Sequence, residues 1–197
     1  MSFKIVDKFE KKIADYFSAP FAIATDSCTH AIELCLIYTK AKKINVPLNT
    51  YLSIPMLASK LDLKLEWRDE KWNDYYYVTK NIIDGAVYWK KNGYIKKKLI
   101  CLSFQFKKHI NIGRGGIILT DSLKAKEELI RLSYDGRDRN LPWHKQNIKK
   151  IGYHYYLTPE SASLGIEIFN KKKNIKPIKW SYENYPNLKT LKVFKQK

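Results

Sequence analysis

The sequence has little cysteine, little arginine and no long apolar run, and each shortage argues against a class of protein. Its 197 residues include three cysteines, Cys28, Cys35 and Cys101, an odd number without a short paired spacing. This pattern argues against a disulfide framework and a zinc ribbon, and it favours reduced thiols. No apolar run is long enough to span a bilayer, so we expect no membrane segment. Since the N-terminus carries no secretory segment, we expect a cytoplasmic protein.

Acidic residues are also scarce, and the formal net charge is +18. Such a charge suggests nucleic-acid binding, but two observations argue against it as the main function. The lysines are spread over the whole chain instead of forming one stripe, and arginine, the better reader of bases and phosphates, is rare. Abundant Lys, Ile, Asn and Tyr is instead typical of an AT-rich genome. A basic surface can still attract a small anionic substrate.

Apolar patterns predict alternating helices and strands along the chain. Helices are predicted over residues 6–17, 26–41, 55–61, 123–133 and 158–170. Strands are predicted at 21–25, 44–46, 63–67, 81–84, 99–102 and 117–119. The polar and aromatic residues 68–80 predict an exposed connection or a hairpin. This alternation predicts an α/β protein with a mainly parallel sheet flanked by helices.

The stretch from Leu99 to Asp121 joins two predicted strands through a polar loop. The first strand stops at Ser103, and two adjacent lysines, Lys107 and Lys108, precede the glycine cluster at residues 113–116. This order puts a hydroxyl and an amine at one edge of the sheet, where the glycines let backbone approach a ligand closely. The loop can therefore seat a phosphorylated cofactor. In so lysine-rich a chain, a single lysine is more often a solvated surface charge.

Two other junctions place polar groups at strand ends. Asp26-Ser27 caps a helix whose first turn contains Cys28 and Thr29, and such a turn offers N–H groups and a hydroxyl to a phosphate. Many strand–helix junctions bind nothing. Asp84 ends an apolar run abruptly, so it is either a turn former or, at the carboxyl end of a parallel strand, a ligand contact.

Five segments, in this order, resemble one family. They are FEKKIADYFSAPFAIATDSCTHAIELCL, VPLNTYLSIPMLA, IIDGA, CLSFQFKKHINIGRGGIILTD and GYHYYLTPESASLG. Together they resemble the DegT/DnrJ/EryC1/StrS family of pyridoxal-phosphate-dependent sugar aminotransferases, and in particular its short viral and phage members. The resemblance implies the large domain of the aspartate-aminotransferase-like fold (fold type I) over residues 1–170, with 171–197 as an irregular extension. It also implies a location in the cytoplasm of an infected host cell.

The resemblance assigns three residues to the ring of the cofactor, pyridoxal 5′-phosphate (PLP). Lys108 matches the lysine that holds the cofactor as a Schiff base and moves protons during the reaction. Asp84 matches the carboxylate that pairs with the protonated pyridine nitrogen. Tyr51 matches the aromatic side chain that stacks on the ring, although a tyrosine in a chain with 14 of them is more often a packing residue.

Other positions match the phosphate site of the family, some of them with changes. Ser103 and Thr29 match phosphate ligands, and Cys28 replaces a glycine while still offering its N–H. His154 replaces an asparagine in a loop that reaches the phosphate in the partner subunit, and an ordinary surface histidine is an equal alternative. Val87 replaces a polar residue near the cofactor's phenolic oxygen, so that contact is missing.

Full family members are nearly twice as long and carry a C-terminal small domain, so we expect a wetter pocket here. The resemblance implies a homodimer with shared active sites that moves an amino group from an amino-acid donor to the keto sugar of a nucleotide sugar. No metal is implied. The alternative is a degenerate member that no longer catalyses and acts as a binding or assembly partner.

Overall fold

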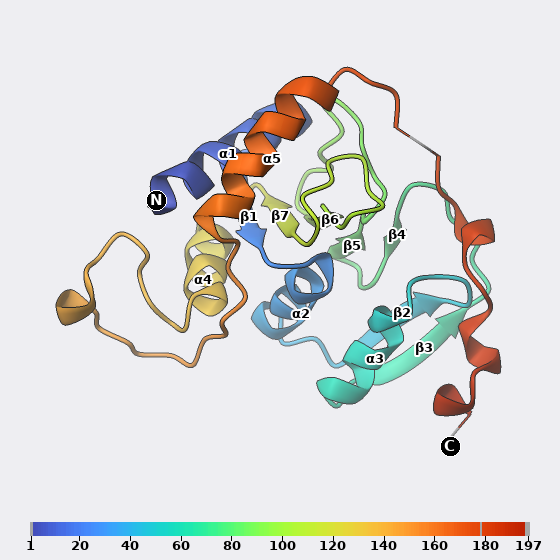
Figure 1. Ribbon diagram of the computed structural model, residues 1–197. Helices are drawn as coiled ribbons and strands as arrows, with labels where there is room; N and C mark the ends of the chain where they lie inside the picture. The colour runs from blue at the N-terminus through green and yellow to red at the C-terminus, as the bar shows by residue number, and fades with distance from the viewer. Residues whose placement is uncertain (1, 178, 196–197) are drawn as a thin grey trace.

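The structure, a computed structural model, alternates helices with strands as the sequence predicts (Figure 1). It describes residues 2–177 and 179–195, so residues 178, 196 and 197 of the predicted extension lie outside the described residues. The helices are α1 (Phe3–Phe17), α2 (Cys28–Tyr38), α3 (Ser53–Lys60), α4 (Leu123–Ser133) and α5 (Pro159–Lys172). The strands are β1 (Phe21–Thr25), β2 (Lys43–Pro47), β3 (Lys64–Arg68), β4 (Tyr76–Tyr77), β5 (Ile82–Asp84), β6 (Leu99–Ser103) and β7 (Gly116–Thr120).

The central sheet has the strand order β1-β7-β6-β5-β4. β5 and β6 are parallel, whereas β7 is antiparallel to both β1 and β6, and β4 is antiparallel to β5. The α/β class is confirmed, but the sheet, expected to be mainly parallel, is mixed. The loop of residues 104–115 contains no helix, and without a helical crossover β6 and β7 pair as antiparallel neighbours.

The strands β2 and β3 form a separate parallel pair joined through α3. The N–H of Asn45 in β2 donates to the carbonyl of Val78 at 2.8 Å, which links this pair to the chain just after β4. The segment 68–80, predicted as an exposed connection or hairpin, contributes β4 to a hairpin with β5. Within it Tyr76 is buried, because this part of the segment is a sheet strand and not a surface loop.

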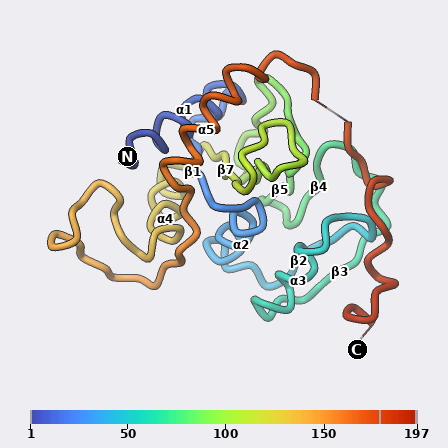
Figure 2. The backbone as a smooth tube through the Cα atoms, in the orientation of Figure 1, coloured from blue at the N-terminus to red at the C-terminus, as the bar shows by residue number. Residues whose placement is uncertain are grey.

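Helices cover both faces of the central sheet. α1 and α5 lie side by side on one face, and α2 and α4 pack on the other (Figures 1 and 2). Successive residues of β6 and β7 alternate between the two apolar cores: Ile100 and Ile117 face α1, whereas Cys101 and Ile118 face α2. Burial of each large side chain contributes about 1.5–3 kcal/mol, which fixes the register of these strands. Among the described residues, no helix has the length and apolar character needed to cross a bilayer.

The carboxyl ends of β1, β5 and β6 meet at one edge of the sheet because these strands run in one direction. There the chain leaves β1 into α2, leaves β5 at Asp84 and leaves β6 at Ser103. α2 begins very close to β7: a Cβ at Gly116 would lie 2.5 Å from the backbone nitrogen of Cys28, far inside van der Waals contact. Only glycine permits this approach, so Gly116 allows the N-terminus of α2 to reach this edge.

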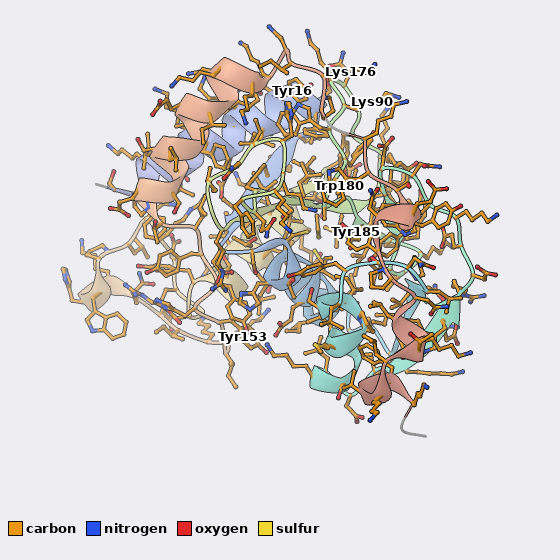
Figure 3. The ribbon with its side chains drawn as sticks, turned by 45° about the vertical axis from the view of Figure 1, so that its right-hand side comes forward. Tyr16, Lys90, Tyr153, Lys176, Trp180 and Tyr185 are labelled. Atoms are coloured by element: carbon orange, nitrogen blue, oxygen red, sulfur yellow. The ribbon has the colours of Figure 1, made fainter. Side chains whose placement is uncertain are left out.

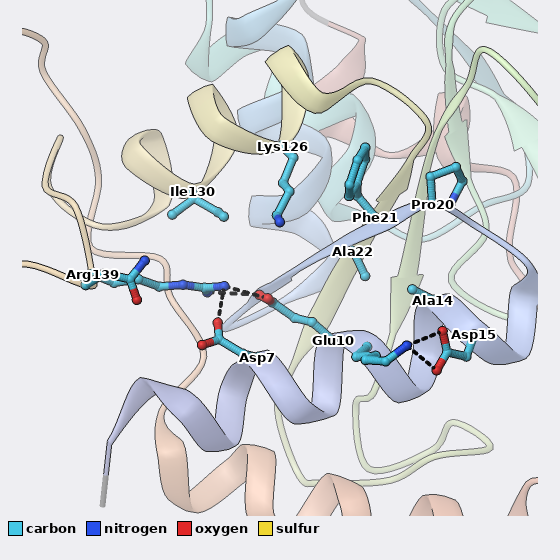
Figure 4. A pocket seen from close by; sticks show the side chains of 12 residues that line it. Asp7, Glu10, Ala14, Asp15, Pro20, Phe21, Ala22, Lys126, Ile130 and Arg139 are labelled. Atoms are coloured by element: carbon cyan, nitrogen blue, oxygen red, sulfur yellow. Dashed lines mark hydrogen bonds and ion pairs between the residues drawn. The ribbon is translucent and has the colours of Figure 1, made fainter.

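A long loop, residues 134–158, joins α4 to α5 and projects from the body of the molecule (Figure 1, left). Arg139 anchors it to α1 (Figure 4). The guanidinium donates to Glu10 through two nitrogens, at 3.0 and 2.6 Å, and lies 2.7 Å from Asp7. Glu10 also accepts the N–H of Ala24 at 2.7 Å, so one buried carboxylate joins the loop, α1 and the edge strand β1.

Candidate active site

A cavity of about 870 Å³ lies at the edge of the sheet where β1, β5 and β6 end. The residues predicted from the sequence that line it are Cys28, Thr29, Tyr51, Asp84, Ser103 and Lys108. His154, the remaining predicted site residue, lies elsewhere: its side chain is 70% exposed, and its Nδ1 is 2.9 Å from a carboxylate oxygen of Asp135. Within one chain the structure therefore does not bring His154 to the other predicted residues, and its predicted role concerns a second copy.

Lys108 is held by the loop that follows β6. The backbone of this loop is closed on itself, because the N–H of Phe104 donates to Gly115 at 2.9 Å and the N–H of Lys108 donates to Gln105 at 2.7 Å. Burial lowers the pKa of Lys108, and negative charge at Asp84 only partly opposes the shift. A lowered pKa increases the share of neutral amine, which is the nucleophilic form.

Asp84 is buried at the end of β5 and accepts two hydrogen bonds. The hydroxyl of Tyr76 donates to one carboxylate oxygen at 2.6 Å, and the N–H of Ala86 donates to the other at 3.0 Å. Thr50 donates in turn to the Tyr76 hydroxyl at 2.8 Å. Burial raises the pKa of Asp84, although both hydrogen bonds and the charge of Lys108 oppose the shift. These hydrogen bonds orient the carboxylate. Because a buried negative charge is costly without a partner, a cation bound next to Asp84 would stabilise its charged form.

The N-terminus of α2 forms the part of the cavity best suited to an anion. The first N–H groups of a helix have no partner within the helix and carry partial positive charge, and here they belong to Cys28 and Thr29. Three hydroxyls add to them: the Thr29 oxygen lies 2.7 Å from that of Ser53 on α3, and Ser103 lines the same cavity. This group of donors fits a phosphate.

Asp26, just before α2, would repel an anion at the helix terminus if it were unpaired. One of its carboxylate oxygens lies 2.6 Å from Nδ1 of His30, and the other accepts from Arg114 at 3.0 Å. The His30 ring stacks on Tyr155 with 3.6 Å between centroids, which fixes its orientation. Arg114 therefore offsets the negative charge of Asp26 next to the anion site, and His30 forms a further polar contact with it.

Tyr51 lines the cavity with 55% of its surface exposed, so it is not a packing residue of the core. Sequence reasoning missed four other residues of the site. They are Ser53, Tyr76, Trp180 and Tyr185. Ser53 follows a predicted loop, and a hydroxyl at the start of a helix is a local signal that could have found it. Nothing local marks the other three, because they reach the site from a short strand and from the irregular segment after α5.

The residues present fit PLP. A helix terminus with nearby hydroxyls suits the phosphate, a buried carboxylate suits a protonated ring nitrogen, and an amine of lowered pKa suits an aldehyde. In the part of the chain that the structure describes, neither Asp84 nor Lys108 forms an ion pair, whereas Asp26 and Arg114 at the cavity mouth pair with each other. The carboxylate and the amine are thus left available to a ligand in one cavity.

The raised pKa of Asp84 predicts a pH dependence of stability in the cofactor-free protein. The folded state keeps the Asp84 proton at a pH where the unfolded chain has lost it, so the wild type loses stability as pH rises above about 4 until the folded pKa is passed. Asp84→Asn lacks this titration. Urea unfolding between pH 4 and 8 should therefore show the wild type losing stability relative to Asp84→Asn, by about 1.4 kcal/mol for each pH unit between the unfolded and the folded pKa. If the wild type instead gained stability relative to Asp84→Asn as the pH rises, the burial of a carboxylate at this position would be contradicted.

Known structures share the fold. AtS13 from Actinomadura melliaura matches with a TM-score of 0.76 at 15% identity, over 86% of this chain and 60% of that one. Spr1654 from Streptococcus pneumoniae, described as a sugar aminotransferase and solved in its PLP form, matches with a TM-score of 0.70 at 15% identity, over 85% and 59%. GDP-4-keto-6-deoxymannose-3-dehydratase (ColD), solved with bound GDP-perosamine, matches with a TM-score of 0.68 at 18% identity, over 85% and 61%. The chain thus has the type I fold of PLP-dependent aminotransferases and spans about 60% of the length of these neighbours.

A comparison with curated proteins finds no significant match. The model of the DegT/DnrJ/EryC1/StrS aminotransferase family, however, matches residues 1–65 and 84–177. These ranges include all of the predicted site residues; the internal gap, residues 66–83, contains β4 with parts of β3 and β5. Because the match extends over most of its length, the chain belongs to the DegT/DnrJ/EryC1/StrS aminotransferase family.

Proposed function

We propose that the protein is a PLP-dependent aminotransferase that moves an amino group from an amino-acid donor to the keto sugar of a nucleotide sugar. The observation that carries the proposal is that Lys108, Asp84 and the N-terminus of α2 line one cavity. The nucleotide-sugar ligand of ColD supports the substrate class. The proposal keeps the cytoplasm as the expected location.

When bound, PLP supplies an electron sink that stabilises negative charge on the carbon next to the reacting nitrogen. The Asp84 carboxylate would accept a hydrogen bond from the protonated ring nitrogen and keep its positive charge in place. The first turn of α2, with Thr29 and Ser103, would bind the phosphate. The Nζ atom of Lys108, neutral at lower pH than an ordinary lysine, would hold the cofactor at its aldehyde carbon, and the same amine would accept and return the proton that the reaction moves.

The mouth of the cavity suits an anionic substrate. Arg114 lines it with a side chain that is 68% exposed, and one nitrogen of its guanidinium donates to Asp26. The net charge of +18 adds a long-range attraction for phosphate groups. Tyr51, exposed at the same mouth, offers a ring face to a flat group such as the cofactor ring. These features support a nucleotide-linked substrate.

We also propose a homodimer, in which the loop of residues 134–158 meets a second copy. This loop carries four large apolar side chains that are exposed: Leu141, Trp143, Ile148 and Ile151. An exposed apolar patch of this kind marks an interaction site. His154 lies in the same loop, so a second copy would explain why it is remote from the cavity of its own chain.

The proposed function predicts a covalent adduct on one lysine. Adding PLP to the purified protein should produce a visible absorbance band, and borohydride reduction followed by dialysis should leave the cofactor on a peptide that contains Lys108. Lys107→Ala is the matched control, because Lys107 is exposed and does not share the burial of its neighbour. It should retain both the band and the adduct.

The opposite result would favour the alternative function. If the cofactor is absent after dialysis, or is spread over many lysines without preference for Lys108, the chain is not a PLP enzyme. A degenerate member that binds a longer aminotransferase or a nucleotide sugar then becomes the better hypothesis, in keeping with a length of about 60% of its structural neighbours.

A further inference from the structure

The segment after α5 returns to the cavity and is fixed there. We call residues 180–188 the C-terminal strap. The N–H of Tyr182 donates to the carbonyl of Trp72 at 3.1 Å, and the N–H of Leu188 donates to Leu48 at 2.8 Å. The side-chain amide of Asn49 donates to the carbonyl of Tyr185 at 2.8 Å. Since Leu188 is also buried, the strap is attached at both ends and in the middle.

Two aromatic side chains of the strap line the cavity, Trp180 and Tyr185. Figure 3 shows both on the side of the strap that faces the body of the molecule. The Lys108 amine lies 4.6 Å from the centre of the Trp180 ring, well within the range of a cation–π contact. Burial raises the pKa of Tyr185, and the negative charge of Asp84 adds to the shift, so this hydroxyl stays neutral near the carboxylate.

The strap therefore changes one expectation from the sequence. The sequence predicts a wetter pocket, but Trp180 and Tyr185 of the same chain form one wall of it. The position of that wall is specific, because Trp180 covers the amine of Lys108, and Tyr185 lines the same cavity as the Asp84 carboxylate.

We infer that the strap closes the active site from within the chain, and that Trp180 is a positioning residue that shields the Lys108 amine from water and holds it toward the cavity. The inference rests on the proposed function for the role of Lys108, but the contact itself does not depend on the cofactor. An indole face attracts the charged amine and excludes water from one side of it, so the amine loses much of its freedom to point into solvent.

Labelling of lysines with acetic anhydride tests the shielding in the full chain without cofactor. The rate is measured against pH for each lysine by mass spectrometry, so that the plateau reports access and the midpoint reports the pKa. In the wild type, Lys108 should have a lower plateau and a lower midpoint than the exposed Lys107. Trp180→Ala should raise the plateau of Lys108 by about tenfold, as expected for loss of local protection.

Two controls separate positioning from a general loss of structure. Trp180→Phe keeps a ring over the amine and should restore the wild-type labelling rate of Lys108, whereas Lys107 should label equally in all three proteins. Trp180 is only partly buried, and the backbone bonds of the strap do not involve its side chain, so both variants should fold. Lys108 that labels as fast as Lys107 in the wild type, or that is unaffected by Trp180→Ala, would overturn the inference.

A second arm with PLP distinguishes this inference from the proposed function. If Trp180→Ala changes the labelling of Lys108 but neither protein traps PLP, the strap shields the lysine and the proposed function is wrong. If PLP is trapped on Lys108 equally well and borohydride reduces it at the same rate in the wild type and in Trp180→Ala, the function stands and the shielding role is rejected.

Discussion

Lys108→Ala should lower the rate of amino-group transfer by about 10²–10⁴-fold through the loss of proton transfer alone, and further through the loss of the nucleophile. Lys107 also lines the cavity, but it is exposed and its amine lies over the ring of Phe106, 5.6 Å from the centroid, so we do not expect it to replace the partly buried Lys108. The direct readout is a single turnover, in which an amino donor such as glutamate converts the PLP-loaded protein and the visible band disappears.

The size of the cavity suggests a rescue experiment with a small amine. Lys108→Ala removes a flexible chain from a space of about 870 Å³, so a small amine such as methylamine should enter and restore part of the lost rate. Lys107→Ala should keep nearly the full wild-type rate. If Lys108→Ala turns over as fast as Lys107→Ala, the lysine assignment is wrong, and another amine must act.

Arg139→Met should lower the free energy of unfolding by about 3–5 kcal/mol, because it leaves a buried carboxylate without its cation. Arg139 and Glu10 have side chains that are 8% and 6% exposed. Burial lowers the pKa of Arg139, but the hydrogen bonds and charge of Glu10 outweigh it and raise the pKa overall. Figure 4 shows that the guanidinium also reaches Asp7, so one substitution breaks three contacts between the projecting loop and α1.

Urea unfolding at neutral pH measures this loss, with two comparisons. Arg131→Met removes an arginine that is 49% exposed and 3.9 Å from Asp138, and it should cost less than about 1 kcal/mol. The double variant Glu10→Gln with Arg139→Met removes both charges, while the new amide oxygen can still accept the N–H of Ala24, so it should be more stable than Arg139→Met alone. Equal stability of Arg139→Met and Arg131→Met would show that the pair is not buried in solution.

Two of the predicted site residues came together because they stand at strand ends. Asp84 and Ser103 each end a short apolar run, and parallel strands deliver such ends to one edge, so local sequence was enough to bring them near each other. The family resemblance added the role of Lys108, which composition alone could not separate from the other lysines. Tyr76 shows where this reasoning fails: it stands among tyrosines in a polar segment, and only pairing with β5 buries it against Asp84.

The relative direction of the strands was harder to predict from the sequence than their positions. The pattern of apolar residues predicted the positions of β6 and β7 closely. An apolar run does not indicate, however, whether the two strands pair in parallel or antiparallel orientation. The pairing was decided by the loop of residues 104–115, which folds back on itself and returns the chain directly beside β6. The mixed sheet is therefore a property of the connection and not of the strands.

By itself, the sequence determined the helices and strands, the polar groups at their ends and the resemblance to a family of PLP enzymes, because these depend on spacing over a few residues or on matching segments. The tertiary structure alone decided which further side chains join the predicted residues at the cavity and which remote side chains pair elsewhere. Trp180 meets Lys108 across 72 positions of the chain, and Arg139 meets Glu10 across 129. Contacts over such separations leave no periodic signal, since they are fixed by how the elements pack and not by the order of neighbouring residues.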